Sequence, residues 1–192
     1  MKQVDTLQRQ LGIETVWDRL RSISNPAPIT RQVLGVSQAD WVEPMAHVLS
    51  RLGVQKGMVV YGQDGTDELS AAANTRICEF ADGQYKTYEI CPEQFSLQRC
   101  DVRELQGGTP TENAAMTRRV LRGEMGPCRT AILLNAGAGL YIGGASLTLA
   151  AGITRARELI DSGMALEKME DFIAMSQNMG KIEKVKIATC QD

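Results

Sequence analysis

Two adjacent carboxylates end the most polar loop of the chain. This loop, residues 62–68, directly follows the short apolar run 58–61 and finishes on Asp67 and Glu68. Mg²⁺ takes oxygen ligands, commonly one or two carboxylates together with phosphate oxygens and water. An Asp–Glu pair at the exit of a strand suits such an ion, and Gly62 and Gly65 let the backbone bend so that both carboxylates can face one cleft. Asp67 and Glu68, here called the acidic pair, are therefore candidate metal ligands.

The same residue types also have a purely structural interpretation. A solvated acidic loop, or an acidic first turn of a helix, would place two carboxylates here, and spacing alone favours that interpretation. Asp64 stands before a glycine, which is common turn chemistry, so we expect it to orient the loop rather than bind metal. Asn113 is expected to serve the cap region of a helix, and His47 to be a partly exposed helical residue rather than a base.

The acidic loop must be positioned by a buried strand and by the elements around it. The apolar run 58–61 predicts that strand, and Asp82-Gly83 between two alternating segments, 76–80 and 85–90, predicts an antiparallel hairpin. Helical spacing and stop signals predict five further helices: one capped by Ser37 and ended by Gly53, one from Thr111 to Gly123, one from Pro127 to Gly144, one from Ser146 to Gly163, and one over 166–177. Residues 7–20 are expected to form two short helical pieces.

This order of elements predicts an α/β domain with a mixed β-sheet and flanking helices, rather than a strictly alternating wound sheet. The chain has 192 residues and is long enough for one sizeable core, so one domain is the default. The run 131–151 carries no charge, but its glycines and Asn135 indicate a buried helix and then a break rather than a membrane span. Beyond Gln177 we expect a weakly ordered tail or an edge strand.

Charge and cysteine content restrict the partners and the compartment. A formal net charge of −2 gives no long-range field that would attract nucleic acid or an anionic membrane. Five cysteines with one histidine and no C-x-x-C pair argue against a thiolate metal site and favour reduced thiols in a cytoplasmic protein. The first residues lack the apolar stretch of a signal peptide, so no export is indicated.

Several segments, read in order, resemble the later half of the anthranilate phosphoribosyltransferase family. The most specific match is 60–70, which is similar to the family's His-Gly-x-Asp-Gly-x-Asp-Glu-x-Ser signature. Other matching segments are Leu11-Gly12-Ile13, Asn25-Pro26-Ala27, Leu34-Gly35-Val36, Pro92-Glu93-Gln94-Phe95, Gly107-Gly108 with Glu112-Asn113-Ala114, Gly126-Pro127 through Leu133-Leu134-Asn135-Ala136, and Ile160-Asp161-Ser162-Gly163. Together they cover nearly the whole chain.

The resemblance implies a fold and an activity. The fold would be the large domain of the anthranilate phosphoribosyltransferase and nucleoside phosphorylase type, truncated at its N-terminus, with residues 1–176 as the partial domain and 177–192 as the tail. The activity would be transfer of a phosphoribosyl group from phosphoribosyl diphosphate to anthranilate in tryptophan biosynthesis, with Mg²⁺-bound diphosphate held by Asp67 and Glu68. The family's helical N-terminal domain, through which it forms homodimers, and its upstream phosphate-binding loops would be absent.

Two departures from the family pattern bear on the acceptor. Gln8 stands where the family usually has the arginine that pairs with the anthranilate carboxylate, and glutamine keeps a hydrogen bond but loses the charge-assisted fork. Arg21-Ser22 replaces the family's Gly-Pro, so another aromatic amine could be preferred. These departures, with the missing upstream loops, leave a second hypothesis open: a truncated or divergent paralogue without catalysis that acts as a binding or assembly module.

Overall fold

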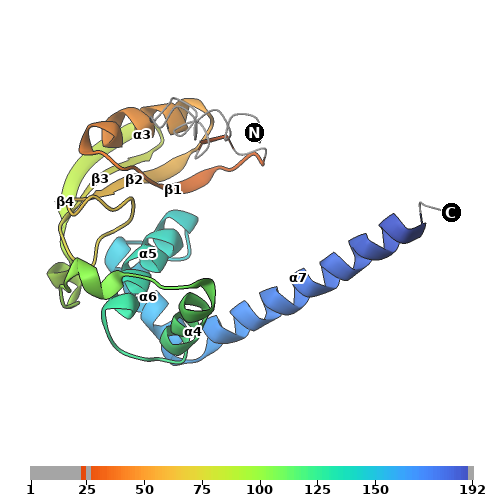
Figure 1. Ribbon diagram of the computed structural model, residues 1–192. Helices are drawn as coiled ribbons and strands as arrows, with labels where there is room; N and C mark the ends of the chain where they lie inside the picture. Colours follow the sequence, from red (N-terminus) through yellow and green to blue (C-terminus); the bar gives the residue numbers. More distant parts are fainter. Residues whose placement is uncertain (1–22, 25–26, 190–192) are drawn as a thin grey trace, which may run out of the picture.

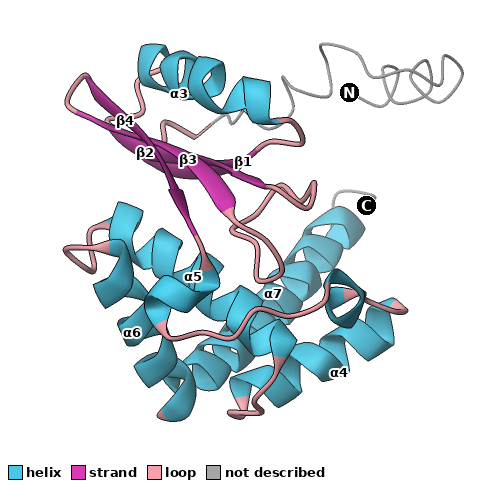
Figure 2. Ribbon diagram, turned by 90° about the vertical axis from the view of Figure 1, so that its left-hand side faces the viewer, coloured by secondary structure: helices cyan, strands magenta, loops and turns pink. Residues whose placement is uncertain are grey.

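The computed structural model describes residues 23–24 and 27–189, with side chains as far as Asn178. The helical pieces predicted over 7–20 and the acceptor residues Gln8 and Arg21-Ser22 lie outside the described residues. Along the described part, one mixed sheet is enclosed between a single helix on one face and a group of helices on the other (Figures 1 and 2). The predicted fold class is confirmed.

The sheet has four strands in the order β1-β2-β3-β4. These are β1 (Arg31–Gly35), β2 (Lys56–Gly62), β3 (Thr75–Ala81) and β4 (Gln84–Ile90). β1 and β2 are parallel, whereas β2–β3 and β3–β4 are antiparallel. The hairpin between β3 and β4 turns at Asp82 and Gly83, whose φ angles of 50° and 77° are the left-handed values that a tight two-residue hairpin requires. The strand and hairpin predictions are confirmed.

β2 is buried on both faces, so its alternate side chains enter two separate cores. Val59 packs with Leu49 of α3 (Val42–Arg51) beneath the single helix that connects β1 to β2. Met58 and Val60 pack on the opposite face, among Leu134 and other side chains of the helical group. Because α3 on one face and the helical group on the other both present apolar side chains to β2, its sequence is a continuous hydrophobic run rather than an alternating pattern.

The helical group contains η2 (Pro92–Phe95), η3 (Val102–Leu105), α4 (Pro110–Leu121), α5 (Pro127–Gly143), α6 (Leu149–Asp161) and α7 (Met164–Thr189). α5 ends at Gly143, with Gly144 at a φ of 86°, and α6 starts only at Leu149, so the predicted break in the apolar run is confirmed. Within the described residues, no helix is long and apolar enough to cross a membrane.

Three predicted helix starts are wrong by a few residues. Thr109, not Thr111, caps α4, because Pro110 occupies the first helical position and Glu112 completes a reciprocal pair of cap bonds with Thr109. Thr148, not Ser146, caps α6, its hydroxyl accepting a bond from the Ala151 N–H at 3.1 Å. Ser37 caps no helix, since a turn of 3₁₀ helix, η1 (Ala39–Trp41), precedes α3.

The expectation of an edge strand beyond Gln177 is also wrong. α7 continues as one helix through this region to Thr189 and projects away from the rest of the molecule (Figure 1). Residues 178–189 combine three lysines with β-branched Ile, Val and Thr, and Gly180 is the one strong helix breaker among them.

α5 is attached to the sheet by polar contacts around its C-terminal turn. Tyr141 donates a hydrogen bond to Glu79 of β3, and Tyr88 of β4 donates to the other carboxylate oxygen at 2.8 Å. The Lys56 ammonium lies 3.8 Å from the centre of the Tyr141 ring, and Arg31 Nη1 donates to the Ile142 carbonyl at 2.9 Å. Cations at a helix C-terminus satisfy its last carbonyls and oppose its dipole. The helix therefore has a fixed position beneath β1 to β4.

α5 also packs closely on α6 through two glycines. A Cβ on Gly152 would lie 2.3 Å from the Gly137 carbonyl oxygen, so the two backbones touch there. Gly139, in the same helix as Gly137, faces open space. The close approach explains why the run of small residues in α5 is needed, and it fixes α6 relative to the sheet through α5.

We predict that Gly152→Ala lowers the free energy of unfolding by about 2 kcal/mol, since over-packing against backbone costs about 3 kcal/mol and the gain in helix propensity returns about 1 kcal/mol. Gly139→Ala, which makes no contact, should raise it by up to about 1 kcal/mol. Urea denaturation of both variants measures the difference. Equal effects of the two substitutions would contradict the close helix approach.

Alkaline pH should weaken the attachment of α5. Burial, together with the hydrogen bond to Glu79, raises the pKa of Tyr141 to about 12, and the same causes raise the pKa of Tyr88. A raised folded-state pKa gives stability that is complete below the unfolded-state pKa of about 10 and is lost as pH rises toward 12.

We predict that Glu79→Gln lowers the pKa of both tyrosines, because it removes the negative charge beside their hydroxyl groups; tyrosinate absorbance against pH measures this. An unchanged titration would contradict the hydrogen bonds between the two tyrosines and Glu79.

Candidate functional site

The acidic loop is closed by its own backbone immediately after β2. The Gly62 N–H donates to the Thr66 carbonyl at 2.9 Å, and the Gly65 N–H donates to the Gly62 carbonyl at 2.8 Å. Gly65 has a φ of 91°, a conformation that L-residues rarely adopt. The loop is thus a compact turn that returns the chain to the end of the strand from which it left.

Asp64 stabilises this turn from within. Its Oδ2 accepts a hydrogen bond from the Ser70 hydroxyl at 2.8 Å, and its Oδ1 lies 3.4 Å from the Thr66 N–H. The Ser70 oxygen in turn accepts from the N–H groups of Ala72 and Ala73 at 3.0 and 2.9 Å. A carboxylate used in this way is committed to loop geometry, as the Asp-Gly turn chemistry predicted.

Asn135 of α5 holds the far end of the loop. Its Oδ1 accepts from the Leu69 N–H at 2.9 Å, and its Nδ2 donates to the Leu69 carbonyl at 3.0 Å. The same nitrogen lies 3.0 Å from the Ala131 carbonyl and 3.5 Å from Glu68 Oε2. One amide therefore pairs with both backbone groups of a buried residue, in the manner of a neighbouring strand, and fixes the residue that follows the acidic pair.

Gly35, at the end of β1, contacts the acidic pair from the other side. A Cβ at this position would lie 1.6 Å from the Asp67 carbonyl oxygen, so only glycine fits. β1 and β2 are parallel, and both point their carboxyl ends at this loop. In open α/β sheets ligands bind outside the carboxyl ends of the strands, so the loop lies where such a fold places its site.

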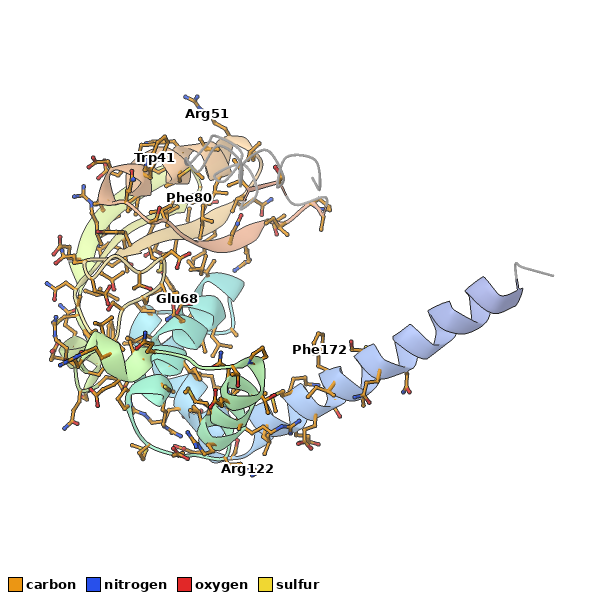
Figure 3. All side chains as sticks on the ribbon, in the orientation of Figure 1. Trp41, Arg51, Glu68, Phe80, Arg122 and Phe172 are labelled. Carbon is orange, nitrogen blue, oxygen red and sulfur yellow. The ribbon has the colours of Figure 1, made fainter. Side chains whose placement is uncertain are left out.

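The two carboxylates are not equivalent in the structure. Both residues are exposed and neither makes an ion pair among the described residues, although Glu68 Oε2 also lies within reach of Asn135 Nδ2. Glu68 lines a cavity of about 390 Å³ with Asp64, Ser70 and Arg103, and lies between the sheet and α5 (Figure 3). Asp67 is not among the residues that line this cavity.

A magnesium ion bound to phosphate oxygens fits this donor set. Mg²⁺ keeps several waters and needs only one or two protein carboxylates when phosphates supply further oxygens. Within the ranges 23–24 and 27–189, no group of three or more His, Cys, Asp and Glu residues could hold a metal without such help. A metal ion at the acidic pair would therefore need oxygen ligands besides those of Asp67 and Glu68.

The structure also shows the surroundings of Asn113, His47 and Asn135. Asn113 bonds both the N–H and the carbonyl of Gly108, at 2.8 and 3.2 Å, next to the start of α4, so its cap-region role is confirmed. His47 is exposed on α3, and its ring contacts the Tyr85 ring in a tilted arrangement, with the ring centroids 4.0 Å apart. The role of Asn135 was missed, although a lone amide within the apolar run 131–151 was a signal, since a buried amide must find partners.

The arrangement has close counterparts among known proteins. A sequence family described as "Glycosyl transferase family, a/b domain" matches residues 1–166. The chain belongs to this family.

Curated relatives named anthranilate phosphoribosyltransferase match most of the chain. The chain is 44% identical over 173 residues to "Anthranilate phosphoribosyltransferase" of Methanobrevibacter smithii, covering 90% of this chain and 52% of that relative. It is also 44% identical over 176 residues to the protein of the same name from Lacticaseibacillus paracasei, covering 92% and 52%. The chain spans about half the length of the curated relatives it matches.

Solved structures of glycosyl transferases with that name superpose on the chain. Anthranilate phosphoribosyltransferase from Thermus thermophilus gives a TM-score of 0.83 at 40% identity, covering 91% of this chain and 51% of that one. The enzyme from Saccharomyces cerevisiae in complex with PRPP and Mg gives a TM-score of 0.81 at 26% identity, covering 91% and 50%. The observed sheet and helices are therefore those of the family.

We predict that Asn135→Ala lowers the free energy of unfolding by about 1–3 kcal/mol, because it leaves the buried backbone groups of Leu69 without partners. Hydrogen exchange at the Leu69 amide should accelerate more than exchange in the β3–β4 hairpin. Asn178→Ala, an exposed amide on α7, serves as the matched control and should leave both measurements unchanged. Unaltered exchange at Leu69 would mean that Asn135 does not hold the loop.

Proposed function

We propose that this glycosyl transferase family member takes part in the transfer of a phosphoribosyl group from phosphoribosyl diphosphate to anthranilate or a similar aromatic amine. Supporting this are the relatives' shared name and the position of the acidic loop at the carboxyl ends of β1 and β2. The single observation that carries the proposal is the exposed acidic pair, which makes no ion pair within the part of the chain that the structure describes and whose loop is held by Asn135 and Gly35.

The proposed role of Asp67 and Glu68 is to hold Mg²⁺ bound to the diphosphate. When bound, the ion would neutralise charge that develops on the leaving diphosphate. In this role the two side chains would offer anionic oxygen donors from a loop whose backbone is bonded to α5 at Leu69 and abuts Gly35 at Asp67. A structure of the yeast relative is described as a complex with PRPP and Mg, which supports the same class of ligand here.

The acceptor specificity is proposed to depend on Gln8. A neutral amide there would bind a carboxylate with one hydrogen bond instead of a charged fork, so affinity for anthranilate should be weaker than with arginine. With a net charge of −2 we expect neither nucleic-acid nor membrane partners. Cys78, Cys91, Cys100 and Cys128 are free thiols, which supports the cytoplasm as the proposed compartment.

A second proposal is a non-catalytic binding or assembly module. The observation that favours it is the exposure of large apolar side chains on α7, where Phe172 is 71% and Met175 64% exposed (Figure 3). Exposed apolar clusters commonly mark surfaces that meet another protein. Formation of phosphoribosyl anthranilate by this chain alone would exclude a purely non-catalytic role.

Removal of the acidic pair's charge should weaken metal-dependent ligand binding. We predict that titration of phosphoribosyl diphosphate with Mg²⁺ into the 192-residue chain releases saturable heat, and that Asp67→Asn/Glu68→Gln lowers the affinity at least about tenfold. Isothermal titration calorimetry with and without EDTA measures both.

The matched control removes two other carboxylates. Glu167→Gln/Asp171→Asn changes the net charge equally but alters exposed residues of α7, so its affinity should equal that of the original chain. Identical heats for the original chain and the Asp67→Asn/Glu68→Gln variant would remove the metal role. Equal weakening by both double variants would reduce the effect to overall charge.

A further inference from the structure

A second cavity lies on the other side of η3 from the acidic pair. Its volume is about 850 Å³, and it shares no lining residue with the cavity beside Glu68. The loop 96–100, the first turn of α5 and the last turns of α6 surround it. Three arginines, one from each of these segments, line it: Arg99, Arg129 and Arg157. Nothing in the proposed transfer reaction uses this cavity.

Arg129 is the unusual group of this cavity. The residue is only 3% exposed, and its Nη2 donates to Asp161 Oδ1 at 2.5 Å. Its Nε and Nη1 are buried and have no hydrogen-bond partner among the described residues. A buried guanidinium with unsatisfied donors is destabilising, and such donors in native proteins ordinarily meet water or an ion. The side chain therefore requires an acceptor that the described chain does not provide.

Two further donors converge on the same space. The first turn of α5 begins at Pro127 and carries no side-chain cap, so its leading N–H groups are free to bind an anion. Arg157, half buried on α6, makes no hydrogen bond or ion pair within the described residues. These donors come from two different helices and line one cavity, and guanidinium and backbone N–H groups are the usual donors to phosphate oxygens.

The remaining charged groups that line the cavity are already paired. Asp161 accepts from Arg129, and Glu104 Oε2 accepts from the Asp101 N–H at 2.9 Å. Arg99 is held by two bonds to Glu93 at 2.8 and 3.2 Å. Asp161 is therefore paired with a cavity arginine, whereas Glu104 accepts only a backbone N–H and keeps its charge. The three arginines of the lining outnumber these two carboxylates, and Arg157 is the arginine without a partner among the described residues.

We propose that this cavity binds a phosphomonoester. The phosphate group accepts hydrogen bonds from Arg129, Arg157 and the first turn of α5, and guanidinium groups bind phosphate by charge-assisted hydrogen bonds. The cavity is larger than one phosphate, and Leu97, Met125 and Leu133 provide apolar wall for an organic substituent. Binding is independent of Mg²⁺, because the acidic pair is not part of this cavity.

Side-chain NMR of arginine tests the proposal directly. Inorganic phosphate and phenyl phosphate are titrated separately into the ¹⁵N-labelled chain, with EDTA present and the ionic strength held constant with chloride. The Arg129 Nε–Hε signal should shift in a saturable manner with both probes, and phenyl phosphate should bind more tightly because its ring contacts the apolar wall. A non-saturable shift with both probes, or a shift absent at Arg129, would overturn the proposal.

Matched variants separate a specific site from general charge. Arg157→Gln should weaken phosphate binding about tenfold, the loss expected from one charge-assisted hydrogen bond, and Arg157→Lys should weaken it less. Arg51→Gln, which removes an exposed cation on α3 beyond the sheet (Figure 3), should leave the affinity unchanged. Asp67→Asn/Glu68→Gln should also leave it unchanged. Equal weakening by Arg157→Gln and Arg51→Gln would show non-specific attraction and overturn the site.

Discussion

The pairing of the Asn135 side chain with both backbone groups of Leu69 is the contact on which the candidate site depends. It converts a surface loop into part of the helix–sheet interface, because Leu69 is buried and its backbone cannot be left without partners. The position of Asn135 is itself fixed by α5, which is bonded to the sheet near Tyr141 and packed against α6 at Gly137. These contacts therefore position the backbone next to the acidic pair.

Local signals in the sequence were sufficient to predict most of the fold. The apolar run of β2, the Asp82-Gly83 hairpin and the glycines that end helices each determine their structure within a few residues, so they were found. The helix starts were missed where two candidate caps compete, as with Thr109 and Thr111, since Pro110 decides between them. The length of α7 was missed because residues beyond Gln177, which were expected to form a weakly ordered tail or an edge strand, continue the helix instead.

The sequence predicted which residues belong to the candidate site but not how they are arranged in space. Asp67 and Glu68 were predicted as candidate ligands from their residue types and from the family resemblance, since spacing alone favoured a solvated loop. The different surroundings of the two carboxylates, with only Glu68 beside a cavity, follow from three-dimensional contacts. The same limit hid the arginine-lined cavity, because Arg99, Arg129 and Arg157 are far apart in sequence and have no shared motif. Both cavities are lined by residues of η3 and α5 together with loops that are distant in sequence, so neither cavity can be recognised before the chain is folded.

Paramagnetic broadening by Mn²⁺, used in place of Mg²⁺ with diphosphate present, tests the central claim most directly, because it locates the ion without requiring activity. If the loop held by Asn135 presents both carboxylates to the metal, the amide signals of residues 66–69 and the side-chain amide of Asn135 should broaden first and most strongly. Broadening spread evenly over exposed carboxylates, or strongest on α7, would contradict the account and leave the family fold without this metal site.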